Sequence, residues 1–362
     1  MAAPREAANG IPEVEGALCV PIDVSEQIEF CYARGWTDGL PVVPANRARV
    51  TEMLEAAGLE PDVVIAEMPS RKVAVTAEKV AINAIMAGCK PEYLPVVVAA
   101  VKGLAAPEFV LHHVASGLSG ATIVIVVNGP IARKLGINAT YNLFGPGPDV
   151  RANATIGRAL RLILLNCLRY TPGVSDRATM GTPGKYTCCI AENEEGHPWE
   201  PWHVERGFRP EQSTVTLVAA STMIQVWNTG NHEQLLRTIG DALSFLGSIA
   251  LLDHSPGAVV LSGEHAELLR ASGWSKRRIR EFVVAHACRT VADLKRAGRI
   301  DGEIRAADES TLHYAMDAPE ELLLLCAGSR IGTLSMVLPG FSMEKGAGRT
   351  RPILIEAPAP QS

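Results

Sequence analysis

Apolar residues follow two different spacings along this chain, and the two spacings alternate. Residues 122–127 form an uninterrupted, mostly β-branched run, which predicts a strand buried on both faces. Apolar positions three and four apart predict a helix over 76–88, with Thr76 as its N-cap. The same criteria predict further strands at 62–68, 214–220, 258–261, 322–326 and 335–338, and further helices at 25–34, 47–58, 91–103, 151–168, 232–245, 264–272 and 276–288. This alternation predicts an α/β fold with flanking helices and a mixed or largely parallel sheet.

The order of these elements suggests three parts. Residues 1–20, rich in Ala, Pro and Glu, are expected to form a flexible arm, 21–205 a first α/β lobe and 206–362 a second. Both lobes carry a strand, helices and another strand, which favours two similar lobes with a cleft between them, although no fixed-period repeat is present. Residues 170–210 contain several Gly and Pro without periodicity, which is typical of a functional surface.

Composition and charge exclude several classes of protein. The 362 residues are 47% hydrophobic and 20% charged, so the chain can bury a large core. The formal charge of -5, with no basic run beyond residues 276–278, argues against a nucleic-acid surface. No apolar stretch approaches the length of a membrane span, and residues 1–16 do not resemble an export signal, so a cytoplasmic location is expected. The 8 cysteines are irregularly spaced, which argues against a disulfide framework or a zinc ribbon.

A glycine-rich turn at 145–149 leads into the helix that begins near Arg151. Free backbone N–H groups and the helix dipole at such a position favour an anion. Arg151 and Arg158 share a helix face, Asn153 projects from the first turns, and Gly157 implies close packing or close ligand approach. We therefore expect Arg151, Asn153 and Arg158 to bind a carboxylate or phosphate; a structural turn with surface arginines is the alternative. Neither a Walker nor a Rossmann motif is present, so no nucleotide cofactor is assigned.

Residues 184–203 concentrate unusual side chains. Two tryptophans and two histidines lie within seven residues, close to several glutamates. This pattern predicts an aromatic wall, including Trp199, that carries an acid/base pair such as Glu194 and His203, with Lys185 as a further catalytic candidate. The alternative is a loop that the tryptophans anchor and whose acidic face is solvated.

Two strand ends are further candidate positions, because ligands in open α/β sheets bind beyond the carboxyl ends of strands. Asn128 begins an Asn-Gly-Pro turn directly after the 122–127 strand, and it is expected to bind substrate unless the turn is purely structural. His265 follows the 258–261 strand and is a catalytic candidate. His112 and His113, expected on a strand, point to opposite faces there. No metal-binding motif is present, so a divalent metal would need distant residues, with His112, His113 and His265 as the candidates.

Cys89 lies between two predicted helices and next to Lys90. The neighbouring ammonium and the following helix N-terminus would both lower the pKa of its thiol, which predicts a partly exposed nucleophile. A cysteine packed between small residues is the alternative.

Several segments together resemble a poorly characterised bacterial family whose members are associated with, or fused to, UGSC-type (seleno)proteins. These segments are GWTDGLPVVP at 35–44, AGCKPEYLP at 87–95, NGP at 128–130, RANATIGR at 151–158 and PGKY at 183–186. The first of them forms an ordered loop whose Trp36 and Asp38 we count among the substrate-binding candidates. The resemblance implies small-molecule catabolism and a UGSC-type partner, since this chain has no Cys-Gly-Ser-Cys of its own.

These observations lead to two expectations about function. The first is an enzyme on a small carboxylated molecule, performing carbon–heteroatom bond cleavage or a thiol-assisted transformation as a lyase, hydrolase or reductase component. The second is a non-catalytic subunit or small-molecule binding protein that completes the active site of a UGSC-type redox partner. The expected partners are a small anionic substrate, the UGSC-type protein and further copies of this chain in a homo-oligomer, but neither nucleic acid nor membrane.

Overall fold

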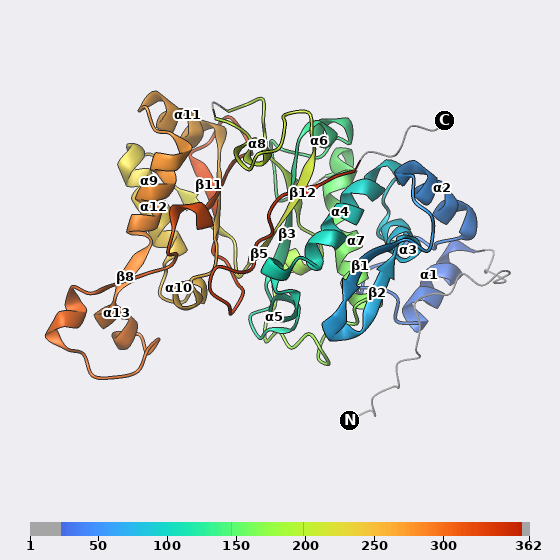
Figure 1. The fold of residues 1–362 in the computed structure, drawn as a ribbon, viewed down its shortest axis with the longest axis horizontal. Coiled ribbons are helices and arrows are strands. Elements are labelled where there is room, and N and C mark those ends of the chain that lie inside the picture. The colour runs from blue at the N-terminus through green and yellow to red at the C-terminus, as the bar shows by residue number, and fades with distance from the viewer. Residues whose placement is uncertain (1–22, 146, 198, 357–362) are drawn as a thin grey trace.

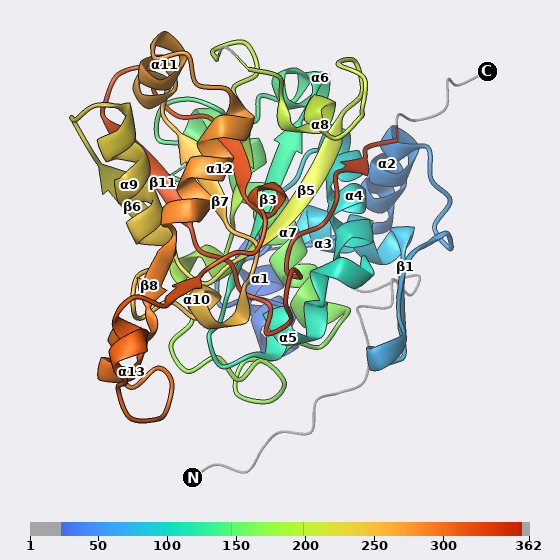
Figure 2. The ribbon, with the colours of Figure 1, turned by 60° about the vertical axis from the view of Figure 1, so that its left-hand side comes forward.

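The computed structural model describes residues 23–145, 147–197 and 199–356, and the arm expected at residues 1–20 lies outside them. The protein is an α/β protein with mixed sheets, parallel strand pairs and flanking helices, which confirms the predicted fold class. Two four-stranded sheets lie next to each other in the middle, and helices cover their outer sides (Figures 1 and 2).

The first sheet is built around the strand expected from the most hydrophobic run. Its strand order is β12-β5-β3-β4, with β3 at Thr122–Asn128, β4 at Cys189–Ala191, β5 at Thr214–Ala220 and β12 at Ile353–Leu354. β3 runs parallel to β4 and antiparallel to β5, and almost all of its residues are buried. This burial explains why its sequence is continuously apolar rather than alternating.

The second sheet repeats this arrangement. Its strand order is β10-β7-β11-β6, with β6 at Ile224–Trp227, β7 at Ala258–Leu261, β10 at Leu323–Cys326 and β11 at Leu334–Leu338. β7 is parallel to β10 and antiparallel to β11, as β3 is to β4 and β5, and an antiparallel edge strand completes each sheet. The two lobes therefore share one strand pattern.

The chain crosses between the lobes twice, and this changes the division expected at residue 205. β5 ends in the first sheet and the next strand, β6, is the edge strand of the second; β11 ends in the second sheet and β12 is the edge strand of the first. Both β5 and β12, which fall within 206–362, thus belong to the first sheet. The first crossing leads from β5 to β6, the edge strand of the second sheet, and the second crossing leads from β11 back to β12, the edge strand of the first sheet.

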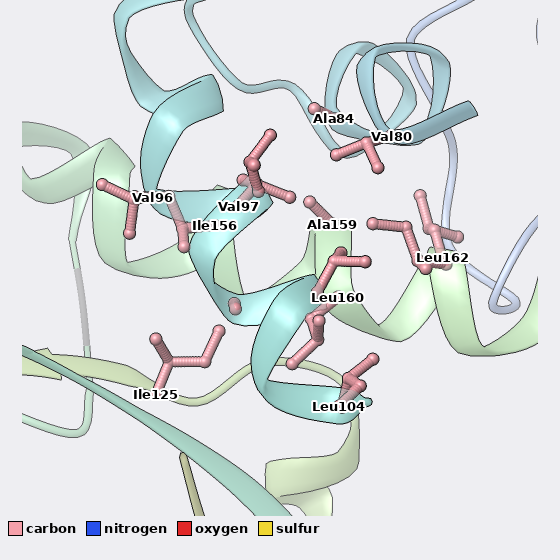
Figure 3. Close-up of a cluster of buried hydrophobic side chains, with 14 of the residues drawn as sticks. Val80, Ala84, Val96, Val97, Leu104, Ile125, Ile156, Ala159, Leu160 and Leu162 are labelled. Carbon is pink, nitrogen blue, oxygen red and sulfur yellow. The ribbon is translucent and has the colours of Figure 1, made fainter. Parts of the chain in front are cut away.

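Alternation along the strands separates three cores. Val124 and Val126 of β3 face the second sheet, whereas Ile125 and Val127 face the helices of the first lobe. The helices packed on this outer side are α3 at Ala77–Ala87, α4 at Leu94–Leu104 and α7 at Arg151–Asn166. Figure 3 shows Val97 and Leu104 of α4 beside Leu160 of α7 in this core. On the second sheet the covering helices are α9 at His232–Leu243, α11 at Gly263–Ala271 and α12 at Lys276–His286.

The remaining elements lie around this framework. The further helices are α1 at Val24–Ala33, α2 at Arg47–Ala57, α5 at Leu111–Ser116, α6 at Pro130–Lys134, α8 at Trp202–Glu205, α10 at Ala250–Asp253 and α13 at Val291–Arg296. Two small antiparallel pairs join β1 at Val64–Met68 to β2 at Val73–Thr76, and β8 at Cys288–Thr290 to β9 at Leu312–Tyr314.

Two observations concern the helices that precede β3. The strand expected at His112 and His113 is wrong, because both residues lie in α5, where the chain follows the turn Pro107–Phe109. No single helix in the described residues is long and apolar enough to cross a membrane; Pro91–Leu104 and Pro107–Ser116, bent by 74°, reach that length and composition only as a pair.

Candidate functional site

The carboxyl ends of β3 and β4 bring two polar side chains together. Asn128 is the last residue of β3 and Glu192 follows β4 directly, and the register of this parallel pair aligns Val127 with Ala191. Both side chains follow the alternation of Val126 and Ile190, so they lie on the side of the sheet that faces the second lobe. Asn128 Nδ2 donates to Glu192 Oε2 at 2.6 Å, and both side chains are buried.

A glycine turn after β3 adds a second carboxylate. Gly129 has a φ of 90°, and a side chain there would collide with Gln212 O and lie 2.7 Å from Ser213 Cα. In this conformation Gly129 N donates to Glu194 Oε1 at 2.7 Å, and Asn128 Nδ2 donates to the same oxygen at 3.0 Å. The Asn-Gly turn therefore holds the carboxylates of Glu192 and Glu194 side by side.

Two buried histidines face these carboxylates. His203 Nδ1 lies 3.5 Å from Glu194 Oε1, and His197 Nε2 lies 3.5 Å from Glu192 Oε1. Trp199 N donates to His197 Nδ1 at 3.3 Å, so the neutral ring carries its proton on Nε2, which points toward Glu192. Burial lowers the pKa of His197 despite the nearby charge of Glu192, so this ring is neutral at pH 7. We call Asn128, Glu192, Glu194, His197 and His203 the carboxylate–histidine cluster.

The second lobe supplies the positive charge next to this cluster. Lys276, the first residue of α12, places its Nζ 3.6 Å from Glu192 Oε1 and 3.1 Å from Glu205 Oε2. Arg280, one turn further, donates two hydrogen bonds to Glu205 at 3.1 and 2.8 Å. Burial raises the pKa of Glu205, but the hydrogen bonds and charges of Arg280 and Lys276 outweigh it, and the pKa falls below its usual value. The cluster thus lies where the two lobes meet.

Buried polar atoms without partners concentrate at this position. Within the described residues, 10 buried side-chain nitrogen or oxygen atoms make no hydrogen bond. Those in or beside the cluster are Asn128 Oδ1, Glu192 Oε1, His197 Nε2, both ring nitrogens of His203 and Thr214 Oγ1, which belongs to the residue paired with Asn128 on β5. Unpartnered buried polar groups are costly and uncommon in folded proteins, and a functional role is one explanation for them. The cluster therefore has donors and acceptors available for a small polar molecule.

The chemistry that these groups can perform is proton transfer. Glu194 is the most accessible member, with 23% of its side chain exposed, whereas the side chains of Glu192, His197 and His203 are at most 1% exposed. A carboxylate beside an imidazole can act as an acid/base pair. No group of three His, Cys, Asp or Glu side chains in the part of the chain that the structure describes could hold a metal ion.

Three residues predicted from the sequence come together here, namely Asn128, Glu194 and His203. Trp199 is close by, but its indole donates to Trp274 O at 3.1 Å and packs against the core of the second lobe. The sequence analysis missed Glu192, His197 and Lys276. Glu192 follows a strand of only three residues, so only a recognised parallel pairing of β3 with β4 could have indicated it. Lys276 lies in a basic run that resembles a solvated helix start, and nothing in the sequence links it to Glu192.

The predicted anion-binding residues of α7 have protein partners instead. Arg158 donates to both carboxylate oxygens of Asp38 at 2.9 and 2.8 Å, and to the carbonyls of Leu40 and Pro41. Arg151 donates to Gly88 O at 2.9 and 2.6 Å. These arginines fix the loop that contains Asp38 and the end of α3 to α7. The partly buried Arg158 guanidinium is thus engaged by the protein, whereas Arg151 is exposed and donates only to Gly88 O.

The neighbouring predicted residues also hold the backbone in place. Asn153 accepts from Asn138 N at 2.7 Å and donates to Cys189 O at 2.8 Å, so it joins the start of α7 to β4. Trp36 packs edge-on against Phe30, with ring centroids 5.7 Å apart. Lys185 lies near the amino end of β3, far from the cluster at its carboxyl end, because Gly184 packs against Thr122.

Cys89 is not the exposed, low-pKa thiol that its neighbours in sequence suggested. Only 6% of the residue is exposed, and burial raises the pKa of its thiol to about 12, which outweighs the hydrogen bond from Thr155 and the charge of Arg151. The alternative of a packed cysteine is correct, because α3, α4 and α7 close over it within the core of the first lobe. Lys90 forms an ion pair with Glu92.

The other histidine candidates are separate from the cluster and from one another. His265 Nε2 hydrogen-bonds Asn228 O at 2.9 Å, which leaves Nδ1 to accept from Ser335 Oγ at 2.7 Å. Burial lowers the pKa of His265, and both of its nitrogens are satisfied, as expected of a structural histidine. His113 instead faces Ser342 O and Glu344. His112, His113 and His265 therefore do not assemble into a metal site.

Comparisons of the chain with protein-family models, with curated proteins and with solved structures find no match. The resemblance to the UGSC-associated family stays a prediction, and the function has to be argued from the cluster itself.

Proposed function

We propose that this protein is an enzyme that uses the carboxylate–histidine cluster for acid–base catalysis on a small organic molecule, with cleavage of a carbon–heteroatom bond as the reaction. The observation that carries this proposal is the set of unpartnered buried polar atoms at the carboxyl ends of two adjacent parallel strands. Ligands of α/β sheets bind at such strand ends, and a catalytic role is one reason for a fold to leave buried polar atoms unsatisfied.

Glu194 has the geometry of a general base. Gly129 N and Asn128 Nδ2 both donate to its Oε1, so the carboxylate is held in one orientation, while its Oε2 makes no hydrogen bond within the described residues. His203, with no hydrogen bond on either ring nitrogen, is the corresponding acid. In the proposed step Glu194 takes a proton from the carbon next to the leaving group, the electron pair forms a double bond, and the carbon–heteroatom bond breaks. The imidazolium form of His203 gives one proton to the departing heteroatom and becomes neutral imidazole.

The charges of the site limit the reacting group. The positive charges of Lys276, Arg280 and Arg206 lie next to Glu205, whereas no lysine or arginine of the described residues pairs with Glu194. The negative charge of Glu194 therefore favours a neutral or cationic reacting group. The negative end of a carboxylated substrate would therefore have to lie away from Glu194.

The proposal is tested by following the purified chain with a panel of small carboxylic acids, amides and amines in ¹H NMR time courses, which detect any conversion. Replacing Glu194 by Gln or His203 by Gln should lower the rate by at least about 100-fold, the usual contribution of a general base or acid. The matched control is Glu195→Gln, since Glu195 is the next glutamate but is exposed and pairs with Arg133. Conversion that survives both cluster substitutions would contradict the assignment.

A second candidate function is that of a subunit without activity of its own. The near-complete burial of Glu192, His197 and His203 favours it, because a closed cluster also fits a polar network that stabilises the junction between the lobes. The same time courses with a UGSC-type partner added distinguish the two candidates. Conversion only in the mixture, unaffected by Glu194→Gln, would favour the subunit.

A further inference from the structure

A surface cleft on the first lobe lies at the opposite end of β3 from the carboxylate–histidine cluster. Its volume is about 480 Å³, within the range of small-molecule sites. The loop that follows Tyr170 and the turn Pro183–Lys185 form its walls, and Arg161 of α7 lies at its base. Gly184 of this turn packs against Thr122, the first residue of β3, whereas the cluster is at Asn128, about 20 Å further along the strand.

Two cations and one carboxylate lie together in this cleft. Asp176 is buried, and its Oδ2 lies 2.6 Å from Lys185 Nζ and 3.6 Å from Arg161 Nη1. The same three side chains also line a small inner chamber, of about 30 Å³, between α7 and the turn. They therefore belong to the lining of both the inner chamber and the outer cleft. The net charge of the three groups is +1.

Arg161 and Lys185 have more hydrogen-bond donors than the protein itself uses. The 3.6 Å between Arg161 and Asp176 is too long for a hydrogen bond, and the described residues offer the guanidinium no other partner. Lys185 uses one of its three N–H donors on Asp176. Both side chains are largely buried, so their remaining donors have little access to bulk water except through the cleft. A ligand with two anionic oxygens would satisfy them.

The rest of the lining is apolar or uncharged. Met180, 91% exposed, and the half-exposed Tyr186 lie at the cleft together with Pro172 and Pro183. Asp38 also lines the cleft, but its charge is neutralised by Arg158. The cleft thus combines a cationic base with an apolar rim.

We propose that this cleft is a binding site for the carboxylate of a small organic acid, with Arg161 and Lys185 contacting the carboxylate and Met180 and Tyr186 contacting the apolar part. A guanidinium matches the two oxygens of a carboxylate in geometry, and a net charge of +1 is balanced by one carboxylate rather than by a phosphate dianion. The site is separate from the proposed acid–base cluster and does not depend on it.

Isothermal titration of the full chain with hexanoate and benzoate at pH 7 and low salt tests this site. We expect saturable binding with a Kd of about 1 mM or lower, tighter than for acetate, because acetate has no part that reaches the apolar rim. Arg161→Met and Lys185→Met should each weaken binding at least about tenfold, the effect of losing one charge-assisted contact. Arg177→Met is the matched control, since Arg177 is an exposed arginine of the same loop that does not line the cleft.

Met180→Asp tests the same site if Arg161→Met or Lys185→Met, which change buried side chains, disturbs folding. This exposed position tolerates a polar side chain, and the new carboxylate should repel the ligand and weaken binding by a similar factor. Absence of saturable hexanoate and benzoate binding up to about 50 mM, or equal affinity in Arg161→Met, Lys185→Met and Met180→Asp, would overturn the proposal. Inorganic phosphate that binds more tightly than both acids and competes with them would show a phosphate site instead. Glu194→Gln should leave binding unchanged.

Discussion

Replacing Arg158 by methionine removes the ion pair that holds the loop of Asp38 to α7. The Asp38 carboxylate is fully buried, and Arg158, 16% exposed, donates to both of its oxygens. The same guanidinium also donates to Leu40 O and Pro41 O at 3.0 and 2.8 Å. Methionine keeps most of the aliphatic stem, so the substitution isolates the loss of these polar contacts from the loss of packing.

The expected cost is about 3 kcal/mol of unfolding free energy at pH 7, the lower end for removing one partner of a buried ion pair. Two matched variants separate the charge from the hydrogen bonds. Arg151→Met, on the same helix, removes hydrogen bonds to the neutral carbonyl of Gly88 and should cost about 1 kcal/mol. Adding Asp38→Asn to Arg158→Met removes the unpaired charge and should recover part of the loss, so the two substitutions are not additive.

The dependence on pH follows from the carboxyl group. Burial raises the pKa of Asp38, but the hydrogen bonds and charge of Arg158 outweigh it and hold the pKa below 3.8. The pair therefore contributes stability that is fully present above pH 3.8 and is lost as the pH falls through the lowered native pKa. In Arg158→Met the contributions of Arg158 to the Asp38 pKa are lost while burial still raises it, so the Asp38 pKa rises. Protonation of Asp38 then removes the unpaired buried charge that destabilises the variant. The difference between wild type and variant should shrink between about pH 7 and pH 4.

Urea unfolding followed by circular dichroism measures these free energies at each pH. A loss below about 1 kcal/mol for Arg158→Met, or strict additivity with Asp38→Asn, would refute the structural role of the pair. Weakened substrate binding by a variant of unchanged stability would return Arg158 to the role that the sequence suggested.

Three further outcomes are expected. Cys89 should resist iodoacetamide at pH 8 in the native protein and react only after denaturation, because burial raises the pKa of its thiol to about 12; labelling at a midpoint below pH 8.5 in mass spectra would contradict this. Gly157→Ala should lower the free energy of unfolding in urea by about 1–3 kcal/mol, because the new Cβ would collide with Thr187 Oγ1 and lie 2.6 Å from Cys188 N. Gly147→Ala is the control and should cost little, because no atom lies close to that position. Unfolding free energy should fall as the pH drops from about 7 to 5, because burial lowers the native pKa of His197 below 6.5 and the unfolded chain then binds more protons; His197→Gln should make this slope shallower, and an unchanged slope would argue against the neutral buried ring.

The periodicity of the sequence determined most of the local structure. β3, β7 and α3 lie close to where apolar spacing and caps predicted them, and Thr76 N-caps α3 by accepting from Lys79 N. These features depend on residues within a few positions of one another, because burial of one helix face or of both strand faces fixes the pattern of apolar residues. The same local reasoning placed His112 and His113 on a strand that is a helix, since a short apolar run fits either element.

The sequence also indicated part of the candidate site. Asn128 was expected from the turn after a buried strand, and Glu194 and His203 from the density of acid/base side chains in one segment. Glu192, which comes two residues before Glu194, was not singled out, because its importance depends on β4 lying parallel to β3. Lys276 could not be found, since it reaches the cluster only when α12 of the other lobe packs against it.

The tertiary structure alone decided which charges have partners and which chain segments build each lobe. Arg158 carries the same charge in any conformation, but only the approach of the loop at Asp38 makes it a structural residue rather than an anion-binding one. Cys89 is near a lysine in sequence, yet its thiol is buried, and Thr155 of the distant helix α7 hydrogen-bonds it. The return of β12 to the first sheet, after the chain has built the second, likewise has no local signal. The spacing of apolar residues determines helices and strands because these elements depend on residues that are close together in sequence. Pairing and burial depend on contacts between distant residues, which form only when both lobes have packed.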